Sequence, residues 1–141
     1  MNDIEMLNHI AQSAEMGCQG VTAVRKRIKS KAVDSLLQKQ LTRYGKIYHA
    51  AGLMLRNRGK SVRHISPVAK TMTRLSAQMD LRRDNTPSHV AEMMIKGNTM
   101  GVNKLVRDLR TYDRGDISVT MLAKKLLDTE EEHIHELRTL L

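Results

Sequence analysis

The fold is decided by the stretch Leu126-Leu127-Asp128-Thr129-Glu130-Glu131-Glu132-His133-Ile134-His135-Glu136-Leu137. Its apolar residues recur three and four positions apart, which predicts an α-helix with one buried face. Glu130 and His133 fall on that same face, one helical turn apart. A buried face excludes a carboxylate and an imidazole unless they are paired, hydrogen-bonded or bound to metal. The stretch therefore predicts a core helix and, within it, a candidate functional site.

The composition favours an all-α fold. Phe and Trp are absent, Tyr occurs three times, and Met occurs ten times. Methionine adapts to irregular gaps in a helical core, whereas a sheet would need more aromatic and β-branched residues. A chain of 141 residues is long enough to bury a sizeable core. We therefore expect one helical domain over residues 1–141.

Cysteine usage and the absence of long apolar runs indicate the compartment. Cys18 is the single cysteine, which excludes an intramolecular disulfide and is typical of a reducing environment. The first residues, MNDIEML, lack the basic and apolar regions of a signal peptide. No run approaches the roughly 18 apolar residues that span a bilayer. We expect a soluble cytoplasmic protein that does not bind membranes.

Capping signals divide the chain into four long helices and one short helix. The start signals are Asn2 with Glu5, Ser30, Ser66-Pro67, Thr86-Pro87 and Asp116. The first four expected helices cover residues 3–28, 30–58, 66–82 and 87–113, and the fifth starts at 116. Gly59 and Gly115 are predicted to end helices. Tight turns make antiparallel hairpins of the first two and the last two helices, joined by a crossover of residues 59–85.

Apolar positions predict which residues of these helices face inward. On the second helix they include Leu41, Tyr44 and Tyr48; on the short helix they are Val68, Met72, Leu75 and Met79. On the fourth helix Gly97 and Gly101 share the inward face, one turn apart. These glycines indicate close approach to the first helix or, alternatively, room in the core for an ion, water or ligand.

Depth along the hairpins places several polar residues at one level. The turn near residues 29–30 sets Glu15 level with Tyr44, and the turn near 114–115 sets Asn98 level with Glu130. All four residues lie about 15 positions from their turns, or about 22 Å along a helix. The expected interior layer holds Glu15, Tyr44, Asn98 and Glu130, with Tyr48 and His133 one turn away.

A four-helix bundle with Glu-x-x-His on its last helix and an opposing glutamate on its first resembles the ferritin-like superfamily, which includes rubrerythrins and bacterioferritins. The resemblance covers nearly the whole chain in architecture and implies two antiparallel hairpins with the short helix in the crossover. A five-helix up-down array is the competing arrangement. The family's di-iron or di-manganese centre implies that Glu15, Glu130 and His133 are metal ligands, with Tyr44, Tyr48 and Asn98 lining the layer.

Two helices depart from the ligand pattern of that family. Residues 30–58 offer Lys46-x-x-His49, and residues 87–113 offer Asn98 where a carboxylate is needed. Two dications require several anionic ligands. We therefore expect a degenerate metal site in a structural or interaction module without catalytic activity. The alternative is an iron- or manganese-binding oxidoreductase or metal-storage protein that uses Glu15, Glu130 and His133.

Charge is distributed unevenly along the chain. The net charge is +9, and residues 24–79 hold fourteen Lys and Arg residues against the single acid Asp34. Such a basic half attracts polyanions or an acidic partner. A solvated face or an acidic protein partner is favoured over nucleic acid binding through residues 24–79, because no aromatic platform or helix-turn-helix spacing accompanies the charge. The last helix carries the opposite sign at Asp128, Glu131, Glu132 and Glu136, so we expect a homodimer.

Overall fold

The computed structural model describes the backbone of residues 1–141 and the side chains of residues 1–70, 76 and 80–141. The elements, in chain order, are α1 (Asp3–Arg25), α2 (Lys31–Arg56), α3 (Pro67–Arg83), α4 (Pro87–Thr111) and α5 (Ile117–Arg138). The prediction of an all-α fold is confirmed. Over the part of the chain that the structure describes, no helix has the length and apolar content needed to cross a bilayer.

The five helix starts follow the predicted capping residues. Asn2 and Glu5 form a capping box at α1, in which each side chain bonds the backbone N–H of the other residue. The remaining caps each accept a backbone N–H from the first turn, and they are Ser30, Ser66, Thr86 and Asp116. Proline follows the cap in α3 and α4, where its missing N–H costs nothing.

Of the two residues predicted to end helices, one has the expected backbone conformation and the other does not. Gly59 has a φ of 71°, as expected for a residue that reverses the chain after α2. The prediction that Gly115 plays this part after α4 is wrong, because the left-handed residue is Arg114, with a φ of 64°. Gly115 instead lies against the ring of Tyr112, where a β-carbon would collide with the phenol.

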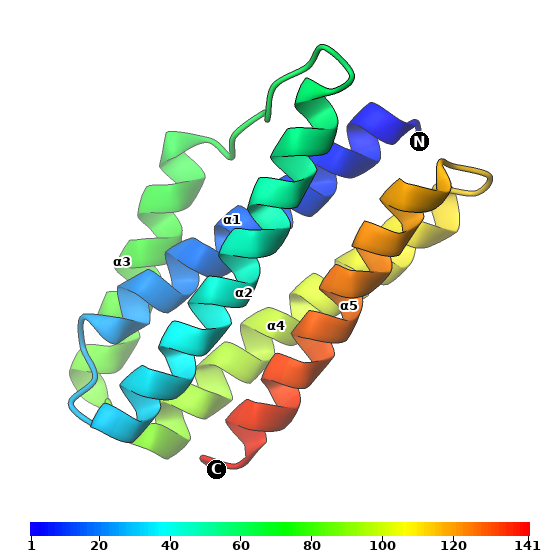
Figure 1. The fold of residues 1–141 in the computed structure, drawn as a ribbon. Helices are drawn as coiled ribbons and strands as arrows, with labels where there is room; N and C mark the ends of the chain where they lie inside the picture. Colours follow the sequence, from blue (N-terminus) through cyan, green and yellow to red (C-terminus); the bar gives the residue numbers. More distant parts are fainter.

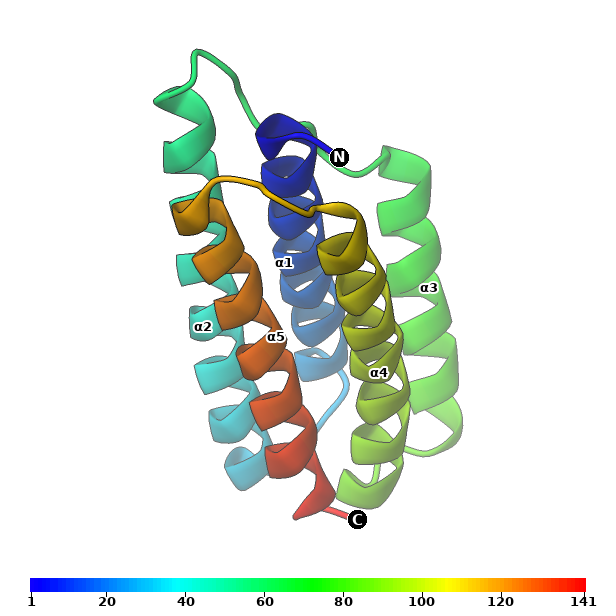
Figure 2. The ribbon, with the colours of Figure 1, turned by 90° about the vertical axis from the view of Figure 1, so that its right-hand side faces the viewer.

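The helices run alternately in opposite directions along one long axis (Figure 1). α1 and α2 form one antiparallel hairpin, and α4 and α5 form the other. Between them, α3 carries the chain back along the length of the molecule, so α4 starts at the end where α2 started and runs in the same direction (Figures 1 and 2). In both views α3 lies at the periphery, and it packs against α1.

α1 is the central helix, because it contacts each of the other four. Its buried residues therefore occupy more than the single face that the sequence predicts. They are Met6, Leu7, Asn8, Ile10, Ala11, Ala14, Glu15, Val21, Ala23 and Val24. A helix surrounded on several sides loses the clean 3.6-residue alternation of a surface helix.

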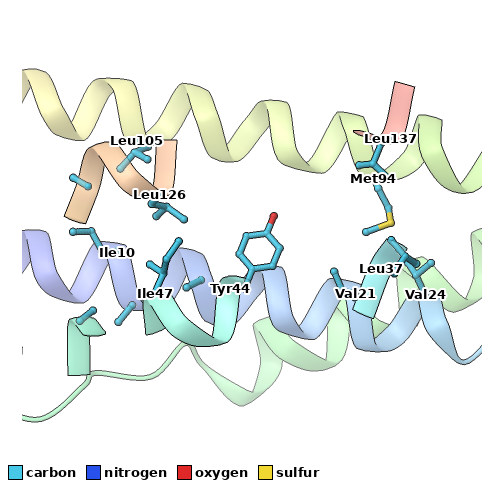
Figure 3. Packing of buried hydrophobic residues seen from close by; sticks show 14 of the residues in the cluster. Ile10, Val21, Val24, Leu37, Tyr44, Ile47, Met94, Leu105, Leu126 and Leu137 are labelled. Atoms are coloured by element: carbon cyan, nitrogen blue, oxygen red, sulfur yellow. The ribbon is translucent and has the colours of Figure 1, made fainter. Parts of the chain in front are cut away.

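Tyr44 divides the aliphatic interior into two groups (Figure 3). Its ring projects from α2 between a group that includes Ile10, Ile47, Leu105 and Leu126 and a group that includes Val21, Leu37, Met94 and Leu137. All of these side chains are buried. The middle of the molecule is therefore a polar layer between two apolar ones.

Four predicted inward positions need correction. The buried face of α2 includes Gln40 and Ile47, whereas Leu41 and Tyr48 are only half-buried. Gly97 on α4 is exposed. Val68 on α3 is 73% exposed, and the other predicted apolar residues of that helix, Met72, Leu75 and Met79, lie outside the described side chains.

One polar face of α1 holds the crossover in place. Asn8 Oδ1 accepts the Arg63 N–H at 2.7 Å, and Gln12 Nε2 donates to the Arg63 carbonyl at 2.6 Å. Glu15 binds the ammonium group of Lys70 at 2.6 Å. Because residues 8, 12 and 15 are spaced four and three apart, they share one face of the helix. This face attaches the chain between α2 and α3 to α1.

Gly17 allows close packing between α1 and α2, and its replacement by alanine is predicted to destabilise the fold. A β-carbon at Gly17 would lie 2.6 Å from the Tyr44 ring, and overpacking of this kind costs about 1–3 kcal/mol. Gly20 on the same helix has no neighbour within 4 Å of its β-carbon position, so Gly20→Ala should stabilise by up to about 1 kcal/mol. Urea unfolding of both variants checks the contrast; equal effects would contradict this packing.

Candidate functional site

The interior polar layer is centred on a hydrogen bond between α2 and α5. The Tyr44 hydroxyl donates to Glu130 Oε2 at 3.1 Å, and the two residues are 1% and 5% exposed. Glycines leave room for both side chains. Gly17 lies under the Tyr44 ring, and a β-carbon at Gly101 would come 3.8 Å from the Glu130 carboxyl carbon. α1, α2, α4 and α5 therefore all contribute to the space around this bond.

His133 is the third residue of this layer and is fully buried. Its ring packs edge-on against Tyr44, with ring centroids 4.8 Å apart and an interplanar angle of 85°. Neither Nδ1 nor Nε2 has a hydrogen-bond partner in the described part of the chain. A neutral imidazole has one donor and one acceptor nitrogen, and buried nitrogens of this kind normally have hydrogen-bond partners.

Burial shifts the two titratable groups of α5 in opposite senses. It raises the pKa of Glu130 to about 7, although the hydrogen bond from Tyr44 opposes the shift. It lowers the pKa of His133 to about 4, with help from the positive charge of Arg43 and partial compensation by Glu136. Each shift favours the neutral form in an apolar environment. At neutral pH His133 is uncharged, and Glu130 is close to half-protonated.

Polar side chains of α2 and α5 connect the interior polar layer to solvent. Gln40 is fully buried, and its Nε2 donates to Glu136 Oε1 at 3.3 Å. Arg43 donates to the same oxygen at 2.7 Å. Gln40 was not predicted to be buried because it is polar, although its spacing of three from Leu37 and four from Tyr44 continues the buried face of α2.

Glu15 belongs to a separate cluster, on the crossover side of α1. Its carboxylate binds Lys70 Nζ at 2.6 Å and His64 Nδ1 at 3.4 Å, and the Tyr48 hydroxyl lies 3.4 Å from the same ring nitrogen of His64. Burial raises the pKa of Glu15, but the hydrogen bond and the charge of Lys70 outweigh it and hold the pKa below the usual value. Lysine thus neutralises this carboxylate.

The structure therefore brings together only some of the residues predicted to share one layer. Tyr44, Glu130 and His133 form one cluster, whereas Glu15 and Tyr48 form the other. Asn98 is half-buried, and its Nδ2 has no partner among the described residues. Within the same part of the chain, no group of three or more His, Cys, Asp and Glu residues is placed to hold a metal ion.

The thiol of Cys18 lies near the second cluster. Cys18 is half-buried and free. Burial raises its pKa, and the negative charge of Glu15 raises it further. A thiol is nucleophilic and binds metal only as the thiolate. Cys18 is therefore held in its unreactive, protonated form.

Comparisons with family models, with curated proteins and with solved structures found no match to this chain. The two clusters, and the charges that surround them, are therefore the basis on which a function is assigned.

The opposite pKa shifts predict opposite pH dependences for two single variants. The raised pKa of Glu130 stabilises the fold below pH 4.5, and this contribution is lost as the pH rises towards 7. The lowered pKa of His133 gives stability that is present above pH 6.5 and is lost as the pH falls towards 4. In the wild type the two contributions largely cancel between about pH 4.5 and 6.5.

Relative to wild type, Glu130→Gln should therefore gain stability as the pH rises through this window, and His133→Asn should lose it. The slopes should approach about 1.4 kcal/mol per pH unit. Urea unfolding between pH 4.5 and 7.5 measures both. A constant offset from wild type at every pH would show that neither group has a perturbed pKa.

Proposed function

We propose that this chain is a ferritin-like helical-bundle protein that acts as a non-catalytic structural or interaction module. In this proposal Glu130 and His133 preserve the residue pattern of a metal site but serve as part of the protein core. The partners would be proteins, either a second copy of the chain or an acidic protein.

The connection between the hairpins supports the ferritin-like assignment. One long crossover between two antiparallel hairpins is characteristic of that variant of the four-helix bundle. Here α3 runs the length of the molecule, and α2 and α4 therefore point in the same direction (Figure 1). α1 and α2 pack together, as do α4 and α5, and contacts of α1 with α4 and of α2 with α5 close the group.

The observation that carries the functional proposal is that both predicted carboxylate ligands already have protein partners. Glu130 accepts the hydroxyl of Tyr44. Glu15 binds Lys70 and His64 of the crossover. A dinuclear centre needs several carboxylates to balance two dications, and an ammonium group beside one of them has the wrong charge. The donor groups of this chain do not fit such a centre.

A specific observation favours the metal-binding alternative for a single ion. Both ring nitrogens of His133 lack a partner in the described part of the chain, and Glu130 lies one turn away. Imidazole and carboxylate together are ligands for iron, manganese or zinc. An ion bound there would take its ligands from α5, with Glu130 using Oε1, because the Tyr44 hydroxyl bonds Oε2.

Metal content distinguishes the proposal from this alternative. Protein purified without a tag should contain far less than one equivalent of iron, manganese or zinc, and its melting temperature should not rise when these ions are added, because no site binds them. Elemental analysis and thermal unfolding provide the measurements. The matched controls are Glu130→Ala/His133→Ala and the exposed pair Glu131→Ala/His135→Ala. Stoichiometric metal lost only in the first of these variants would establish the alternative.

A further inference from the structure

The outer face of α5 has a charge pattern that the two interior clusters do not use. Figure 2 shows α5 in front of α1, between α2 and α4, with its outward side uncovered. That side begins with two exposed apolar residues, Ile117 at 78% and Met121 at 65%. Exposed Lys124 and Lys125 come next, and the exposed acids Asp128, Glu131 and Glu132 follow. The charge thus changes sign along one helix face.

Helical periodicity divides these charges into two flanks. Residues seven apart differ by nearly two full turns and lie on the same side of a helix. Lys124 and Glu131 therefore share one flank, and Lys125 and Glu132 share the other. Asp128 lies between the flanks and midway along the charged segment. Each flank presents a lysine two turns before a glutamate.

Most of these charges have no ion-pair partner in the part of the chain that the structure describes. Lys124, Lys125 and Glu131 take part in no ion pair in the described part of the chain. Glu132 lies 3.7 Å from Arg43 and keeps a side chain that is 57% exposed. The flanks are therefore available to a partner of matching pattern.

We propose that a second copy of this chain docks antiparallel on the outer face of α5, about a twofold axis near Asp128. This axis lies in the interface, perpendicular to both helices. It reverses the direction of the partner helix but keeps each flank on the same side of the interface. Lys124 then faces the partner's Glu131, and Lys125 faces the partner's Glu132. The symmetry repeats both pairs, because a twofold interface uses the same surface on each copy.

The same arrangement covers apolar surface. Ile117 and Met121 of one copy lie over the last turns of the other, where the exposed residues include His135 and Arg138. A parallel pairing of the two helices would set lysines against lysines and glutamates against glutamates, which is unfavourable. The four lysine–glutamate pairs therefore favour antiparallel docking, in which the like charges that meet are the two copies of Asp128 at the axis. The inference rests on the proposed interaction role and names its partner.

A reciprocal charge exchange tests the interface. Variant one is Lys124→Glu/Lys125→Glu, and variant two is Glu131→Lys/Glu132→Lys. Each alone places like charges opposite each other at all four pairs, so its dimer dissociation constant should rise at least about 10-fold. An equimolar mixture restores opposite charges at every pair and should form a heterodimer. Sedimentation equilibrium in the micromolar range measures both, with circular dichroism to verify folding.

The control variant is Lys26→Glu/Lys31→Glu, which changes the net charge as variant one does but at the turn between α1 and α2. It should dimerise like wild type. Added salt should weaken the wild-type dimer, because exposed charges are screened. A monomeric wild type, dimerisation of either folded variant as strong as that of wild type, or a mixture that stays monomeric would overturn the proposal. None of these outcomes alters the metal content, which tests the proposed function separately.

Discussion

The hydrogen bond from Tyr44 to Glu130 is the constraint on which the interior of the structure depends. A carboxyl group in the middle of a helical core is costly unless it is hydrogen-bonded or neutral. Here it is bonded to a tyrosine, and burial raises its pKa to about 7. The bond requires Gly17 on α1 to make room for the ring. The polar layer thus requires a small residue on α1 beside the Tyr44 ring, and it sets the register of α2 against α5.

Local signals in the sequence were sufficient to predict the helices and part of the site. The five caps, the buried positions of Glu130 and His133, and their association with Tyr44 all follow from spacing and side-chain chemistry. Gln40 was missed because a polar residue interrupts an apolar pattern while still lying on the buried face. Glu15 was assigned to the wrong cluster, since depth along a hairpin gives the level of a residue but not the direction in which it points. Its partner Lys70 lies 55 positions away, in a segment whose path only tertiary packing determines.

Charge is neutralised inside the molecule, whereas part of the charge on the outer face of α5 has no ion-pair partner among the described residues. In the interior, Glu130 accepts a hydrogen bond from Tyr44 and its pKa is raised by burial, and Glu15 forms an ion pair with Lys70. On the outer face of α5, Lys124, Lys125 and Glu131 have no ion-pair partner in the described part of the chain, and Glu132 stays 57% exposed beside Arg43. Reactive sites keep carboxylates and imidazoles open to a ligand, whereas interaction surfaces keep charges open to another protein. This distribution supports the proposed interaction role.

A double-mutant cycle on Tyr44 and Glu130 tests the central claim most directly, that the tyrosine satisfies the buried carboxyl group. Tyr44→Phe alone should lower the free energy of unfolding by about 1–3 kcal/mol, because it leaves Glu130 without its partner. In a Glu130→Leu background the same change should cost little, giving a coupling energy of at least about 1 kcal/mol. Additive effects, with Tyr44→Phe equally costly in both backgrounds, would show that the bond does not stabilise the core and would contradict the account.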